Sequence, residues 1–232
     1  LSRLMSPDRE VRRTTAEAVS AALEPGLRTR ASVFNTLLLD KAVDDRLRSF
    51  PSWLASRNLA NEASDESVEA LLEAVRSNYD LPRRWYRLKA ELLGIDRLAD
   101  YDRMASVADE ETSVEWPEAT DLVLTSFHEF SPVLGDLAQR FFDERWIDAP
   151  VRPNKRGGAF CAYTVPSVHP YVLLNYTYKR RDVMTLAHEL GHGVHAALGG
   201  RQGVYHFSTP LTLAETASVF GEQIVFGRLL EQ

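Results

Sequence analysis

The residues with the clearest chemistry in this sequence form the pattern H-E-x-x-H at positions 188–192. Four residues span about 1.1 turns of an α-helix, so His188 and His192 project from one face and can share a metal ion. Glu189 lies about 100° around the helix from His188, where it can face a water on that metal without ligating it. Neutral imidazole is a good ligand for zinc. The pattern therefore predicts a zinc site with an acid beside it.

A catalytic zinc needs a third protein ligand and an open position for water. One known arrangement places a Gly seven residues and a His ten residues after the first His. Those positions are His195 and Leu198, which excludes that arrangement. The other solution takes a Glu from a later helix, and Glu215 is the candidate because it stands among small and apolar residues, where an unpaired carboxylate is costly to bury. The alternative interpretation of Glu215 is an acid favoured by the dipole in the first turn of a helix.

Two residues near these ligands are weaker candidates. His195 lies seven residues after His188, almost on the same helix face. We expect it to support the site or pack beside it, because four protein ligands would close a catalytic centre. Glu222 lies two turns after Glu215 and is a candidate for orienting a ligand imidazole, with an ordinary surface acid as the alternative.

Four further residues are candidates for contacting a substrate. His169 and Tyr176 flank the expected strands, where a structural role is the stronger alternative. Tyr205 and His206 lie in the loop between the two ligand helices, and the nearby Gly203 indicates mobility as readily as function. Asp182, near the start of the H-E-x-x-H helix, is expected to be its N-cap.

The elements that position these residues follow from the apolar pattern. Helical periodicity predicts successive helices from residue 6 to about 146, and the sequence pattern changes at residue 148. Two short strands, at 159–165 and 171–176, are expected to form a hairpin or a nearby pair, with a loop before them. Helices then resume at about 181–198 and after Pro210. We predict a mostly α fold with a small β-sheet next to the H-E-x-x-H helix.

Composition narrows the class of protein. The 232 residues are 44% hydrophobic and 26% charged, as in an ordinary folded protein, and the formal net charge of -6 argues against a nucleic-acid partner. The single cysteine, Cys161, permits no intrachain disulfide and favours a reducing compartment, so we expect a cytoplasmic protein. No apolar run approaches the roughly 20 residues needed to cross a bilayer, which predicts no membrane association.

Two longer segments carry a resemblance to a known family. Residues 188–195 (HELGHGVH) and 214–222 (AETASVFGE) are similar to the oligoendopeptidase F family, which are thimet-oligopeptidase-like zinc endopeptidases of the gluzincin type. The likeness extends upstream and is more diffuse towards the N-terminus, through residues 155–160 (KRGGAF), 169–171 (HPY), 174–176 (LNY), 101–102 (YD) and 8–12 (DREVR).

The resemblance implies a zincin-like, multi-helix fold around a deep channel, and an enzyme that cuts short oligopeptides. It implies that His188, His192 and Glu215 hold one zinc ion per chain and that Glu189 is the general base. Residues 1–147 would then be the helical channel wall, and residues 148–232 the strand pair with the zinc-binding helices, as parts of one continuous domain. The exposed edge of the second strand, 171–176, is expected to pair with an extended peptide.

The chain departs from the family pattern after the third ligand. Family members continue into a segment whose His and Tyr groups hold substrate, whereas this chain ends 17 residues after Glu215 and begins at Leu1 without a Met. We therefore expect a piece of a longer protein that binds zinc but is a weak peptidase. Two alternatives remain open: a zinc carboxypeptidase, and a truncated module that binds metal and peptide without turnover. The intact Glu189 disfavours the second, and the sequence leaves cleavage preference and oligomeric state open.

Overall fold

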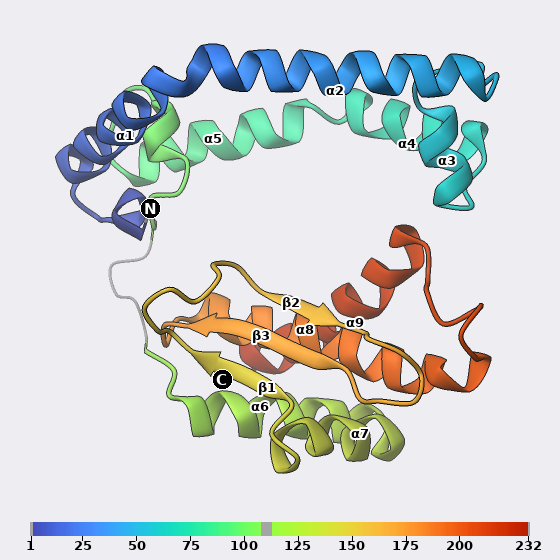
Figure 1. Ribbon diagram of the computed structural model, residues 1–232. Coiled ribbons are helices and arrows are strands. Elements are labelled where there is room, and N and C mark those ends of the chain that lie inside the picture. Colours follow the sequence, from blue (N-terminus) through green and yellow to red (C-terminus); the bar gives the residue numbers. More distant parts are fainter. Residues whose placement is uncertain (1, 108–112, 232) are drawn as a thin grey trace. The chain divides into compact units, whose positions relative to one another are not determined.

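A computed structural model describes residues 2–107 and 113–231, which are mostly helical with one small sheet (Figure 1). The predicted fold class is confirmed. The chain divides into two compact units, Leu1–Glu110 (unit 1) and Glu111–Gln232 (unit 2). The change of sequence pattern at residue 148 falls inside unit 2. The assignment of residues 1–147 and 148–232 to one catalytic domain stays a prediction. None of the described helices combines the length and apolar character needed to span a bilayer.

Unit 1 consists of helices, two of which begin at a recognisable side-chain cap. The side chain of Asp8 accepts the backbone N–H of Glu10 at 2.8 Å, and that of Ser64 accepts the N–H of Ser67 at 3.1 Å. The apolar pattern predicts a helix from about residue 27 to 43, which continues in the structure to Leu47, and the short helix Ala55–Ala60 was not predicted. The elements are η1 (Ser2–Met5), α1 (Arg9–Leu23), η2 (Glu24–Gly26), α2 (Leu27–Leu47), α3 (Ala55–Ala60), α4 (Asp65–Ser77), α5 (Asp80–Leu92) and η3 (Asp100–Asp102).

Unit 1 buries few apolar side chains. The 21 residues of α2 include no buried residue, and its consecutive Leu37, Leu38 and Leu39 are all exposed. The buried residues among those described in unit 1 are Ala90, Ala105, Arg12, Asn58, Lys89 and Asp102. Four of these six are polar or charged, so an apolar core is not what orders this unit.

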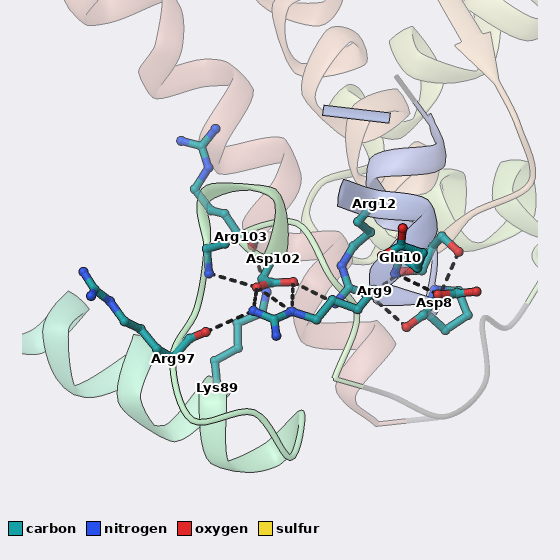
Figure 2. A network of polar contacts seen from close by, with 11 residues as sticks. Asp8, Arg9, Glu10, Arg12, Lys89, Arg97, Asp102 and Arg103 are labelled. Carbon is teal, nitrogen blue, oxygen red and sulfur yellow. Dashed lines mark hydrogen bonds and ion pairs between the residues drawn. The ribbon is translucent and has the colours of Figure 1, made fainter. Parts of the chain in front are cut away.

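A network of charged groups converges on Asp102 instead (Figure 2). The Asp102 carboxylate accepts hydrogen bonds of 2.9 Å from Arg9 Nη2, from Arg12 Nη2 and from the backbone N–H of Ala99. Burial alone would raise the pKa of Asp102, but these bonds outweigh it and hold the pKa below its ordinary value. The buried Lys89 donates to the carbonyl of Arg103 at 2.8 Å. The network therefore ties α1 to the segment that follows α5.

Unit 2 contains the sheet and the helices that bury apolar side chains. Pro117 and Pro132 lie in the first turns of α6 and α7, as their sequence context predicts. The elements are α6 (Trp116–Phe130), α7 (Pro132–Asp143), β1 (Ile147–Pro150), β2 (Phe160–Ala162), β3 (Tyr171–Tyr176), α8 (Arg180–Gly199), η4 (Gly200–Gln202) and α9 (Leu211–Leu230).

The sheet has the strand order β1-β3-β2, which corrects one expectation. β2 pairs with β3 in an antiparallel register, with Phe160 opposite Leu173, as a hairpin pair should. The segment expected to be a loop supplies β1, which pairs with β3 in parallel, with Ile147 opposite Val172. β3 therefore lies in the middle of the sheet, and the prediction that strand 171–176 offers a free edge was wrong. Among the described residues, the outer edge of β2 has no strand partner.

The apolar core of unit 2 lies between this sheet and the helices. α8 packs against β2 and β3, and α9 packs against α8 and α6 (Figure 1). Phe127, Phe141, Leu174, Leu186 and Leu190 are among its fully buried side chains. α8 is thus held by apolar contacts along its length, which fixes the position of the H-E-x-x-H residues that it carries.

Candidate active site and metal centre

The site is built where α8 and α9 cross, and two glycines allow the close approach. A Cβ at Gly191 would lie 2.6 Å from the carbonyl oxygen of Ala217, and a Cβ at Gly221 would lie 2.6 Å from that of Ala187. Both are closer than real contacts allow, and both neighbours are backbone atoms that cannot swing aside. Only glycine at these positions permits the two helix backbones to lie this close.

This crossing brings the three predicted ligands together. The candidate ligand atoms of His188, His192 and Glu215 all lie within 4.8 Å of one another. Oε2 of Glu215 is 3.4 Å from Nε2 of His188 and 3.7 Å from Nε2 of His192. Two imidazole nitrogens and one carboxylate oxygen match the ligand set of a catalytic zinc, which leaves its fourth position to water or substrate. The residues therefore fit such an ion.

The protonation states of the neighbouring groups suit a metal site. Burial lowers the pKa of His192, and His188 and His195 lower it further against the opposing effect of Glu215, so its neutral, ligating form is favoured. Burial also raises the pKa of Glu189, and Glu215 adds to this, while His188 and a backbone hydrogen bond from Cys161 act in the opposite direction. A carboxyl group with a raised pKa is a stronger base than an ordinary Glu.

Two side chains outside the ligand set lie within hydrogen-bond distance of ligand residues. Nδ1 of His188 lies 2.6 Å from Oε1 of Glu222, the residue that the sequence singled out for orienting an imidazole. The Ser218 hydroxyl donates to Oε2 of Glu215 at 2.8 Å. Ser218 was not among the predicted site residues. Its position one turn after Glu215 is a signal that could have identified it, because residues three apart share a helix face.

The other predicted residues lie outside the three-ligand cluster. Tyr176 is buried in the core, where its hydroxyl donates to the carbonyl of Val114 at 2.9 Å. His169 stacks on Trp146 with ring centroids 4.3 Å apart. Tyr205 and His206 are exposed, Tyr205 to 94% of its surface.

Three further residues lie on α8 or near it, and the structure corrects the sequence prediction for one of them. His195 is half-buried, and its Nδ1 makes no hydrogen bond within the described part of the chain. Asp182 is the third residue of α8 rather than its N-cap, and its carboxylate accepts the backbone N–H of Lys179 at 3.1 Å. Tyr163, which the sequence did not single out, follows β2 and packs near His192 with ring centroids 6.4 Å apart. Burial, more than any nearby charge, raises the pKa of Tyr163 to about 12.

Comparison with known proteins places this geometry in a family. Peptidase family M3 matches residues 3–232, and the chain belongs to that family. Over its whole length the chain is 28% identical to the group B oligopeptidase PepB of Streptococcus agalactiae and 25% identical to the chromosomal oligoendopeptidase F of Lactococcus lactis subsp. cremoris. The resemblance to oligoendopeptidase F seen in the sequence is therefore confirmed.

Solved structures show the same relationship. A crystal structure of a candidate peptidase from Chlamydophila abortus shares 27% identity with a TM-score of 0.76, and the match covers 99% of this chain and 38% of that one. Oligoendopeptidase-F from Enterococcus faecium, at 21% identity and a TM-score of 0.59, shares the fold over 100% of this chain and 34% of that one. The chain spans 39% of the S. agalactiae relative and 38% of the L. lactis relative.

Proposed function

We propose that this chain carries the zinc site and general base of a metalloendopeptidase that hydrolyses short oligopeptides. The single observation that carries the proposal is the convergence of His188, His192 and Glu215 from two helices, with Glu189 on the same helix turn. Membership of peptidase family M3 and the oligopeptidase names of the relatives support the reaction class. His188, His192 and Glu215 would hold one zinc ion per chain.

Each protein group then has a defined task. Zinc, when bound, supplies a Lewis acid that acidifies water and polarises the scissile carbonyl. Glu189 takes the proton from the attacking water and passes it to the leaving amine, which its raised pKa favours. Glu222 accepts a hydrogen bond from Nδ1 of His188, which leaves Nε2 as the ring nitrogen that would hold zinc.

The peptide would lie along the free edge of β2. A backbone hydrogen bond from Cys161, in the middle of this strand, acts on the carboxyl group of Glu189, so the strand runs beside the general base. An extended peptide that adds to this edge places its carbonyl groups near the ligand cluster. The proposed partners are thus oligopeptides, and the cytoplasmic location stays a prediction from the single cysteine.

The test is peptide cleavage by the purified, zinc-loaded chain. A mixture of peptides of about ten residues would be incubated with the chain and the products identified by mass spectrometry, beside a chelator-treated sample. E189Q should reduce cleavage by about 10²–10⁴-fold, because the proton acceptor is lost. E118Q removes an exposed acid of α6 in the same unit and should leave cleavage unchanged.

The products separate the alternatives. Internal cleavage that is lost with the chelator and in E189Q supports the endopeptidase. Release of single C-terminal residues would instead indicate a carboxypeptidase. One zinc per chain without cleavage would contradict turnover by this chain and leave a metal- and peptide-binding module. Failure to bind zinc would overturn the assignment of all three ligands.

A further inference from the structure

Ser218 lies directly behind the candidate third ligand. It is on α9, one turn after Glu215, and it is fully buried. Its Oγ is 2.8 Å from Oε2 of Glu215, the same oxygen that faces Nε2 of both histidines. Its Oγ also lies 3.0 Å from the backbone carbonyl oxygen of Glu215. A hydroxyl has one proton, so these two acceptors compete for it.

The carboxylate is the stronger acceptor of the two. It carries a charge and lies at the shorter distance, and hydrogen bonds to charged oxygens are roughly twice as strong as neutral ones. The backbone carbonyl of Glu215, three residues before Ser218, is by contrast an acceptor of the kind that serine hydroxyls contact in many helices. The Ser218 hydroxyl therefore donates its hydrogen bond to the side chain of Glu215 in preference to the helix backbone.

The helix crossing keeps Ser218 in this place. The Cα of Ser218 lies 3.0 Å from where a Cβ of Gly191 would be, so its backbone rests against the H-E-x-x-H helix itself. Glu215, in contrast, is 54% exposed over its side chain, and a free glutamate there would sample several rotamers. A fixed donor next to a mobile acceptor restricts the acceptor.

We propose that Ser218 is a positioning residue that holds the Glu215 carboxylate towards His188 and His192, so that the ligand set is formed before the metal arrives. This inference rests on the proposed metal site, and it adds a residue whose task is orientation rather than ligation. Loss of an outer hydrogen bond to a metal ligand typically lowers metal affinity about 10–100-fold.

The test compares S218A with a matched variant, S126A. Ser126 is also buried in a helix of unit 2, but its hydroxyl donates only to the carbonyl of Leu122, at 2.7 Å. Zinc affinity would be measured by competition with a fluorescent chelator, and ligand geometry by the visible absorption of the cobalt-loaded chain. S218A should bind zinc about 10–100-fold more weakly and change the cobalt spectrum, whereas S126A should match the wild-type chain.

The outcomes distinguish this inference from the proposed function. Equal zinc affinity in S218A and the wild-type chain would overturn it, and so would an equal loss in S218A and S126A, which indicates general loosening. A wild-type chain that binds no zinc overturns both proposals. A chain that binds zinc and loses affinity in S218A, but cleaves no peptide, supports the role of Ser218 and contradicts only the peptidase activity.

Discussion

The two units of this chain bury opposite kinds of residue. Among the described residues, unit 2 buries a contiguous set of apolar side chains around Phe127, Phe141 and Leu190. The part of unit 1 that the structure describes buries Asp102, Arg12 and Lys89 but, of its apolar residues, only two alanines. The stability that comes from apolar burial is insensitive to pH and depends little on how the side chains are oriented. The stability from a buried ion pair depends on both partners and on their geometry.

This difference explains where a reactive site can be held. All three candidate ligands and Glu189 lie on α8 and α9 of unit 2, whose backbones are in direct contact at Gly191 and Gly221. Sites of this kind need supporting residues whose own positions are locked by packing. Unit 1 provides no comparable packing among its described residues, because its longest helix buries none of its side chains.

The largest expected effect comes from removing the central charge of unit 1. D102N leaves the buried Arg12 without its counter-charge and should destabilise unit 1 by about 3–5 kcal/mol, since breaking a buried pair strands an ion. Hydrogen exchange read by mass spectrometry would locate the loss in peptides of α1 and of residues 95–103. D100N removes a carboxylate that is 93% exposed and should change stability by less than about 0.5 kcal/mol. Equal effects of the two variants would show that unit 1 does not depend on the network.

A smaller effect is expected where the helices of unit 2 touch. G191A places a Cβ 2.6 Å from the carbonyl of Ala217, so α8 and α9 must separate, at a cost of about 1–3 kcal/mol. Separation moves Glu215 from the histidines, and zinc affinity should fall with stability. Gly227 on α9 has no atom within 4 Å of its would-be Cβ, so G227A should be neutral or stabilising. Thermal unfolding with and without zinc measures both variants, and a G191A chain with normal zinc affinity would contradict the role given to the crossing.

The smallest effect is a dependence of unit 1 on acid. The folded-state pKa of Asp102 lies below its ordinary value of 3.8, so its contribution to stability is present above that value and is lost as the pH falls through the folded-state pKa. One group changes the free energy of unfolding by at most about 1.4 kcal/mol per pH unit. The protection factors of amides in unit 1, which compare each exchange rate with that of the unfolded chain at the same pH, should therefore fall on acidification below about pH 4, and less steeply in D102N. An identical pH profile in D102N would assign the acid sensitivity to other groups.

Much of the candidate site could be predicted from sequence because its determinants are local. The spacing of His188 and His192 depends only on the helix period, and the exclusion of a third histidine depends only on counting residues. The helix boundaries near Pro117 and Pro132 follow from the preference of proline for the first turn. Glu215 was identified from its place among apolar and small residues, but the burial cost expected there does not apply, because its side chain is 54% exposed.

The rest depends on contacts between elements, which local patterns do not contain. β1 has only four residues, two of which, Asp148 and Pro150, are poor strand formers, so its pairing with β3 was missed and the free edge was assigned to the wrong strand. The hydroxyl of Tyr176 has its partner 62 residues away, at Val114. The contact between Glu189 and β2, and the burial of Ser218 against Gly191, likewise exist only once α8 is docked.

The bonds that Asp102 makes in unit 1 have a consequence for the order in which the chain becomes structured. Arg12 and Asp102 are 90 positions apart, so the ribosome must make most of unit 1 before the guanidinium meets its carboxylate. At the usual elongation rate of about 5–20 residues per second, α1 waits for about 5–18 s. The two ligand helices, joined by a short connection, can meet as soon as α9 has emerged. α1 is therefore made well before its partner segment and is secured late, and during that interval the guanidinium groups of Arg9 and Arg12 lack their carboxylate.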